Sequence, residues 1–150
     1  MKDNKEITQV EEGKVFFDSN ILVYFIDESD SEKQLKAKEL IEAATSNQTG
    51  IVSTQSLQEV YNVATKKLNC PKDKAKQLIK MFSETLPVAQ VTIPLILKAI
   101  DISIKTEYSF WDSLILSAAK DSGCIIVYSE DMQNGHIVDG MKILNPFALA

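Results

Sequence analysis

The chain has 150 residues, of which 45% are hydrophobic and 25% charged, a balance typical of a folded globular protein. This length suffices for one compact core, so we expect a single domain over residues 14–150, preceded by a flexible polar leader over residues 1–13. No apolar run approaches the roughly 20 residues that span a bilayer, and the polar N-terminus does not resemble a secretory signal. We therefore expect a cytoplasmic protein with no membrane partner.

The charged residues restrict the chemistry that the chain can perform on phosphate. Its 16 basic and 21 acidic residues give a net charge of -5, which by itself repels nucleic acid. All of the basic residues are lysines, so there is no guanidinium group for bidentate binding of phosphate. Any reaction at phosphate must therefore depend on metal ions and lysines.

Strand-like and helix-like segments alternate along the first half of the chain. The apolar run KVFF predicts a strand over 14–18, and the capping residues at its end predict a helix over 20–27. Hydrophobic periodicity then predicts an amphipathic helix over 31–47, a strand over 50–54 and a helix over 55–68. A proline begins a further predicted helix over 71–86.

The second half continues the alternation. A strand is predicted over 87–92, followed by helices over 94–107 and 110–121, and the apolar run over 124–129 is typical of a buried parallel strand. Residues 130–140, which contain an Asn-Gly turn signal, are expected to form a polar loop, and no element is assigned after them. The pattern predicts an α/β fold, a three-layer α/β/α sandwich with a mainly parallel central sheet.

Two of the predicted strands run directly into acidic residues. Asp18 ends the first strand, and Glu130 and Asp131 follow the strand over 124–129. In open parallel sheets ligands bind beyond the carboxyl ends of the strands, so these acids are candidate site residues at one edge of the sheet. For each position alone a simpler alternative is favoured: Asp18 caps the next helix, and Glu130 and Asp131 belong to a solvated loop.

Two further acids, Asp112 and Glu59, lie on predicted helices, and helical periodicity places them on different kinds of helix face. Asp112 lies on the apolar side of its helix, where an isolated carboxylate is costly unless it is paired, protonated or bound to a cation. An equally weighted alternative is an acid in the first helical turn, stabilised by the helix dipole. Glu59 lies opposite the apolar stripe of the helix over 55–68, which by periodicity alone indicates a solvated glutamate.

The segments FFDSNILVYF, STQSLQEVYNVATKK and FWDSLILSAAKDSGCIIVYSEDMQNG resemble the successive motifs of PIN-domain nucleases, in order and over roughly residues 14–147. The last of these, with GMKILNPF after it, is similar to the corresponding stretch of VapC-type toxins. The polar leader and the absence of arginine depart from many members of that type. The resemblance implies a catalytic, metal-binding cluster with two accompanying polar residues: Asp18, Glu59, Asp112 and Asp131, with Asn20 and Ser129 orienting them.

Clustered carboxylates raise one another's pKa unless cations neutralise them, and a set of hard oxygen ligands suits Mg²⁺ or Mn²⁺. The resemblance thus implies a metal-dependent endoribonuclease in which a bound ion activates water for attack on an RNA phosphodiester. Lys66 and Lys67 are candidate contacts to the RNA backbone, although exposed lysines usually serve solubility alone.

The resemblance to VapC-type toxins also implies two protein partners, a small VapB-like antitoxin and a second copy of the chain in a homodimer. An RNA-processing nuclease and a PIN domain that binds nucleic acid without cutting it remain alternatives. A haloacid-dehalogenase-like phosphatase is disfavoured, because it requires a second aspartate where this chain has Asn20. We expect His136 to be a surface loop residue, and Phe110 and Trp111 to pack rather than to stack on a base.

Overall fold

The protein is described here by a computed structural model that covers residues 13–148. The predicted leader over 1–13 lies outside the described residues, apart from Gly13. The helices are α2 (Ser19–Ile26), α3 (Ser31–Ser46), α4 (Thr54–Lys66), α5 (Lys72–Thr85), α6 (Ile93–Lys105) and α7 (Phe110–Asp121). The strands are β1 (Lys14–Phe17), β2 (Gly50–Ser53), β3 (Val88–Ala89), β4 (Cys124–Tyr128), β5 (Ile137–Val138) and β6 (Met141–Leu144). Among the described residues, no helix has both the length and the apolarity needed to cross a membrane.

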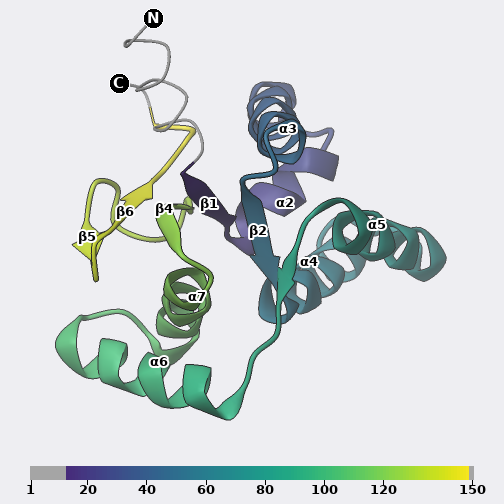
Figure 1. Cartoon of the computed structure of the whole chain (residues 1–150). Helices are drawn as coiled ribbons and strands as arrows, with labels where there is room; N and C mark the ends of the chain where they lie inside the picture. The colour runs from purple at the N-terminus through teal and green to yellow at the C-terminus, as the bar shows by residue number, and fades with distance from the viewer. Residues whose placement is uncertain (1–12, 149–150) are drawn as a thin grey trace, which may run out of the picture.

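The strands form one six-stranded sheet in the order β3-β2-β1-β4-β6-β5 (Figure 1). Strand β1 pairs in parallel with both β2 and β4, β3 and β6 extend the parallel part outward, and β5 pairs antiparallel with β6. Helices α2 to α5 cover one face of the sheet, and α6 and α7 cover the other. The predicted three-layer α/β/α sandwich with a mainly parallel sheet is therefore confirmed.

Two consecutive phenylalanines on β1 divide the core between the two faces. Side chains alternate along a strand, so Phe16 points into the layer of α6 and α7, and Phe17 points into the layer of α2 to α5. Both are fully buried. Because the chain order changes direction across β1 and β4, the carboxyl ends of these two strands form the topological switch point of the sheet.

The C-terminal part of the sheet differs from the expectation. The predicted loop over 130–140 includes β5, which forms a hairpin with β6 through an Asp139-Gly140 turn. Both turn residues have positive φ, as a two-residue turn matching the twist of a hairpin requires. The Asn134-Gly135 pair also forms a turn, as predicted, ahead of β5. The strand predicted over 87–92 shortens to the two residues of β3 at the edge of the sheet, where short strands limit unwanted pairing.

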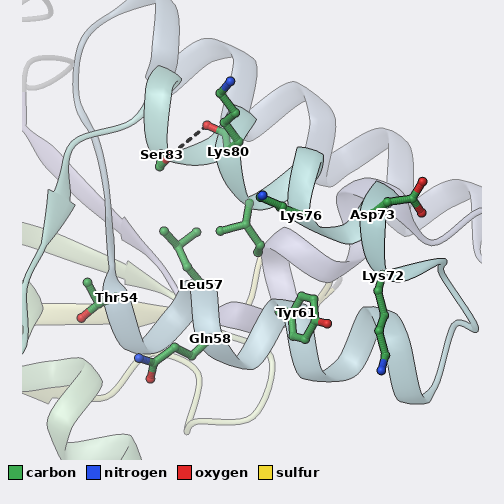
Figure 2. Close-up of a pocket in the computed structure, with 10 residues that line it drawn as sticks. Thr54, Leu57, Gln58, Tyr61, Lys72, Asp73, Lys76, Lys80 and Ser83 are labelled. Atoms are coloured by element: carbon green, nitrogen blue, oxygen red, sulfur yellow. Dashed lines mark hydrogen bonds between the residues drawn. The ribbon is translucent and has the colours of Figure 1, made fainter.

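A groove of about 900 Å³ lies between α4 and α5 (Figure 2). Leu57, Tyr61 and Ile79 contribute apolar surface to it, and lysines of α5 lie along one side. None of the predicted site residues lines this groove. This groove is thus separate from the acidic edge of the sheet.

Two buried serines on α7 give a matched test of packing against α6. The Ser117 hydroxyl donates a hydrogen bond of 2.8 Å to the Leu95 carbonyl, whereas the Ser113 hydroxyl has no partner among the described residues. We expect Ser117→Ala to lower the free energy of unfolding by about 0.5–1.5 kcal/mol, because one hydrogen bond is lost while the Leu95 carbonyl keeps its bond within α6. Ser113→Ala should be neutral or stabilising. Urea unfolding measures both, and equal losses would contradict the assignment.

Candidate active site

Asp18 is a buried carboxylate at the switch point. It follows β1 directly, caps α2 and is only 4% exposed. One side-chain oxygen accepts the backbone N–H of Ser19 at 2.7 Å, and the other accepts the hydroxyl of Ser129 at 2.8 Å. Asp18 therefore does cap α2, but its carboxylate is buried between the ends of β1 and β4 rather than exposed to solvent at the start of the helix.

Asn20 and Ser129 connect Asp18 to Asp131. The Asn20 amide donates to the carboxylate of Asp131 at 3.1 Å and to that of Asp18 at 3.5 Å. The Ser129 hydroxyl donates to Asp18 and accepts the backbone N–H of Asp131 at 3.3 Å. The two polar residues named with the acids thus lie where they orient both carboxylates.

Glu59 joins the same site, although its helix periodicity indicated solvent. Its carboxylate accepts the Ser19 hydroxyl at 2.9 Å and the Gln55 amide at 2.9 Å, and the side chain is partly buried. Gln55 also donates to the Trp111 carbonyl at 3.0 Å, which ties α4 to the start of α7. Sequence reasoning missed Ser19 and Gln55 because neither has a titratable group or a distinctive spacing.

Asp112 lies in the first turn of α7, where its backbone N–H is capped by the Ser109 hydroxyl at 3.1 Å. Burial raises the pKa of Asp112, and the nearby charge of Asp131 raises it further. The alternative that Asp112 is an acid in the first helical turn is therefore correct for its position. The prediction of a partly desolvated carboxylate is also correct, since the side chain is neither fully buried nor exposed.

Repulsion couples the four acids into one electrostatic unit. Burial raises the pKa of Asp18 from its ordinary value of 3.8 to about 7, the hydrogen bonds from Ser129 and Ser19 oppose this rise, and the charges of Glu59 and Asp112 add to it. Asp112 is coupled in turn to Asp131. The sequence-predicted acids therefore lie within range of one another at a single edge of the sheet.

The donor set suits a hard divalent cation. Carboxylate, amide and hydroxyl oxygens are the ligands of Mg²⁺ and Mn²⁺, and the buried charge of Asp18 is the unfavourable group that a cation would relieve. Within residues 13–148, no three His, Cys, Asp or Glu side chains already lie close enough to form a preassembled metal site. An ion that retains several of its waters is the kind that fits such a spread of acids.

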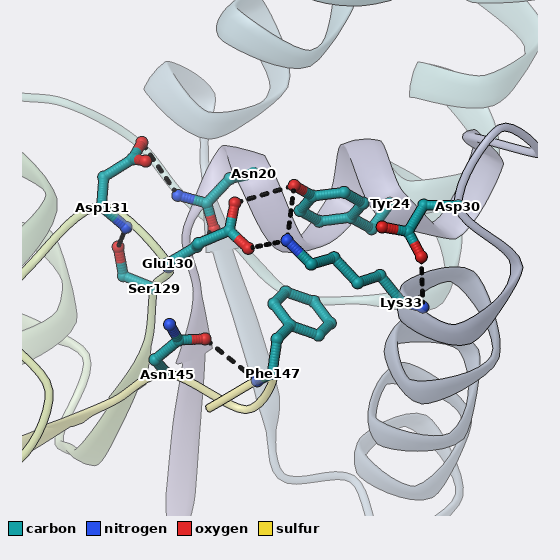
Figure 3. A network of polar contacts seen from close by, with 9 residues as sticks. All are labelled: Asn20, Tyr24, Asp30, Lys33, Ser129, Glu130, Asp131, Asn145 and Phe147. Carbon is teal, nitrogen blue, oxygen red and sulfur yellow. Dashed lines mark hydrogen bonds and ion pairs between the residues drawn. The ribbon is translucent and has the colours of Figure 1, made fainter. Parts of the chain in front are cut away.

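An ion pair and several hydrogen bonds hold Glu130, the residue before Asp131, at the edge of the sheet (Figure 3). The Lys33 ammonium pairs with the Glu130 carboxylate at 2.6 Å, and the Tyr24 hydroxyl donates to it at 2.8 Å. The Glu130 backbone N–H donates to Asn20 at 3.2 Å. The expectation that Glu130 belongs to a solvated loop is thus wrong: α2 and α3 anchor the loop after β4 and with it the approach of Asp131 to the site.

The remaining candidates lie farther from the acids. Lys66 and Lys67 are exposed at the end of α4, with Lys66 two turns from Glu59 on the same side of the helix. His136 lies in the loop before β5, as expected, but it is half-buried and its ring forms a hydrogen bond with the Tyr108 hydroxyl at 2.8 Å. The packing expected of Phe110 and Trp111 holds between their own rings, which meet edge to face with centroids 5.1 Å apart, but Trp111 is 65% exposed and is not part of the core.

A family model that covers most of the chain identifies the fold. Residues 15–134 match the model of the PIN domain, and the chain belongs to the PIN-domain family. This membership argues against a haloacid-dehalogenase-like phosphatase, as does Asn20, which bonds both neighbouring acids. No curated protein sequence matches the chain significantly.

Solved structures with the same fold include bacterial toxins. The VapC20 toxin of Mycobacterium tuberculosis, described as cleaving the sarcin-ricin loop, has 20% identity and a TM-score of 0.64, over 79% of this chain and 90% of that one. A toxin-antitoxin complex from Klebsiella pneumoniae has 17% identity and a TM-score of 0.67, over 91% and 100%. The DNA-bound VapBC complex of Salmonella typhimurium has 18% identity and a TM-score of 0.65, over 87% and 96%.

The raised pKa of Asp18 predicts an unusual pH dependence of stability. Between about pH 4 and pH 7 the unfolded chain has released this proton while the folded chain retains it, so stability falls as pH rises, by on the order of 4 kcal/mol in total. Asp18→Asn should remove this slope and be the more stable form at pH 8 without metal. Urea unfolding in EDTA from pH 4 to pH 8 measures it.

Equal slopes for wild type and Asp18→Asn would contradict the raised pKa. Repeating the urea unfolding at pH 8 with Mg²⁺ gives a second test. A cation bound at the acids should stabilise the wild-type chain more than Asp18→Asn, since the variant lacks the charge that the ion relieves.

Proposed function

We propose that the chain is a Mg²⁺- or Mn²⁺-dependent endoribonuclease whose site consists of Asp18, Glu59, Asp112 and Asp131. The observation that carries the proposal is the buried Asp18 carboxylate at the switch point, coupled electrostatically to Glu59 and Asp112 in a chain of the PIN family. A site with this much uncompensated negative charge favours a cation and, through it, a phosphodiester. The net charge of -5 is then no obstacle, because the loaded site attracts phosphate.

In this proposal Asp18, Asp112 and Asp131 hold the ion, and Glu59 contributes a direct or water-mediated contact. A bound ion would supply charge neutralisation and water activation for hydrolysis. Asn20 keeps the Asp131 carboxylate turned toward Asp18. These contacts keep the acids oriented before an ion arrives, which lowers the cost of binding it.

The biological role that this site supports best is that of the toxin in a toxin-antitoxin pair. The support is the fold shared with VapC20 and with the toxin-antitoxin complexes of Klebsiella and Salmonella. A small VapB-like antitoxin is the partner that follows from this role.

Neutralising single acids tests the catalytic proposal. We expect Asp112→Asn and Asp131→Asn to lower RNA cleavage by more than about 100-fold, beyond the 10- to 100-fold typical of residues that only support a ligand, and Glu59→Gln to fall within that range. Asp121→Asn, on the exposed end of α7, is the matched control and should retain activity. The measurement is cleavage of a labelled RNA with and without Mn²⁺. Full activity of Asp112→Asn in both conditions would refute the mechanism.

The outer face of α6 supports the further proposal of a homodimer. Four large apolar side chains on it are exposed: Ile93 (72%), Leu97 (58%), Ile100 (41%) and Ile104 (76%). These residues are separated by four, three and four positions, an order that is the same in both directions along the helix. Two antiparallel copies of α6 related by a two-fold axis therefore place each apolar residue opposite another. Such a stripe is costly in water and is satisfied by a second copy of the chain.

Charges placed at the centre of this stripe test the dimer. We expect Leu97→Glu and Ile100→Glu, each made singly, to convert a dimer to a monomer, because each new carboxylate would be buried against an apolar residue of the second copy near the axis. Leu35→Glu is the control, since Leu35 is similarly exposed (61%) but lies on α3 outside the stripe. Sedimentation velocity gives the mass, and a monomeric wild-type chain would rule the proposal out.

A further inference from the structure

The groove between α4 and α5 combines an apolar floor with a row of cations. Leu57 and Tyr61 of α4 and Ile79 of α5 supply the floor. Lys72, Lys76 and Lys80 follow one another at intervals of four residues, so their backbone positions form a row along one side of α5, about 6 Å apart along its axis. Figure 2 shows their ammonium groups pointing in different directions from this row. The groove is therefore a local concentration of positive charge in an acidic chain.

These lysines are available for a ligand. Lys72 and Lys76 make no ion pair within the described part of the chain, and Lys80 has only a 3.9 Å contact to Glu84. Both members of that contact are mostly exposed, so it contributes little. By contrast, Lys33, the lysine tied to the acidic site, is already neutralised by Glu130 at 2.6 Å. One carboxylate, Asp73, also lines the groove, at the start of α5.

The groove adjoins the acidic site through α4. Thr54, Leu57, Gln58 and Tyr61 line the groove, while Gln55 and Glu59 of the same helix belong to the acidic site. The two faces are separated by one helix diameter, about 10 Å. A strand held at the acids therefore needs only a few nucleotides to cross α4 and reach the lysines.

We propose that this groove binds the single-stranded RNA that flanks the scissile phosphate. The row of lysines matches a backbone that carries one charge per nucleotide, and the apolar floor suits unstacked bases, with Tyr61, 37% exposed, as the aromatic platform. The inference rests on the proposed ribonuclease function and assigns part of its substrate binding. It also explains how an acidic chain without arginine holds RNA.

The test compares two double variants that each remove two positive charges. Lys72→Gln/Lys76→Gln alters the groove, and the control Lys36→Gln/Lys74→Gln alters exposed lysines outside it. Cleavage is measured in Mg²⁺ on single-stranded RNAs of mixed sequence of about 16 and about 4 nucleotides. The groove variant should raise KM for the longer RNA about tenfold, leave kcat unchanged, and leave the shorter RNA unaffected.

Salt dependence gives an independent readout. Loss of two phosphate contacts should reduce the slope of log affinity against log salt by about 1.4 for the groove variant and leave the control unchanged. Tyr61→Leu should raise KM for the longer RNA, whereas Tyr61→Phe, which retains an aromatic face, should not.

Three results would overturn the proposal. One is an equal KM for groove variant and control, and another is an equal loss on both RNA lengths. The third is a groove whose lysines bind an acidic helical peptide while RNA affinity is unaffected. If the wild-type chain cleaves neither RNA, the ribonuclease proposal fails by itself, and fluorescence anisotropy of the intact longer RNA still tests the groove.

Discussion

The rest of the structure depends on the placement of β1 between β2 and β4. Phe16 and Phe17 are both fully buried, one in each core, so β1 cannot shift by one residue without exchanging the two faces. The residue that follows is Asp18, whose backbone N–H bonds the carbonyl of Tyr128 at the end of β4. The packing that stabilises both cores therefore also places a carboxylate between two strand ends, where a solvated position is not available to it.

Burial of the charged Asp18 carboxylate is unfavourable for folding, but it gives the site an acid with a raised pKa. Burial disfavours its charged form, and the bonds from Ser19 and Ser129 compensate only in part, so its pKa remains raised to about 7. Glu59 and Asp112 add repulsion from two other elements. In the proposed metal-dependent site a cation would relieve burial and repulsion together, so this electrostatic cost would be the source of its affinity for the ion.

Positive charge is distributed so that it does not neutralise this cluster. Lys33 reaches the same edge of the sheet but is held by Glu130 and Tyr24, where it anchors the loop that carries Asp131. The lysines of α5 face a separate groove on the other side of α4. The acidic cluster and this cationic surface are therefore separated by α4, which is the arrangement that the proposed metal-dependent ribonuclease requires.

The sequence by itself determined the alternation of strands and helices, the acid at the end of β1 and the partial burial of Asp112, because these depend on local periodicity and strand ends. It did not determine that Glu59 faces the site or that Glu130 is paired. Periodicity describes burial around one helix axis and not which other element arrives there. Glu59 meets Ser19 from 40 residues away, and Glu130 meets Lys33 from 97 residues away. Only tertiary structure, in which β1 and β4 become neighbours, brings those partners together.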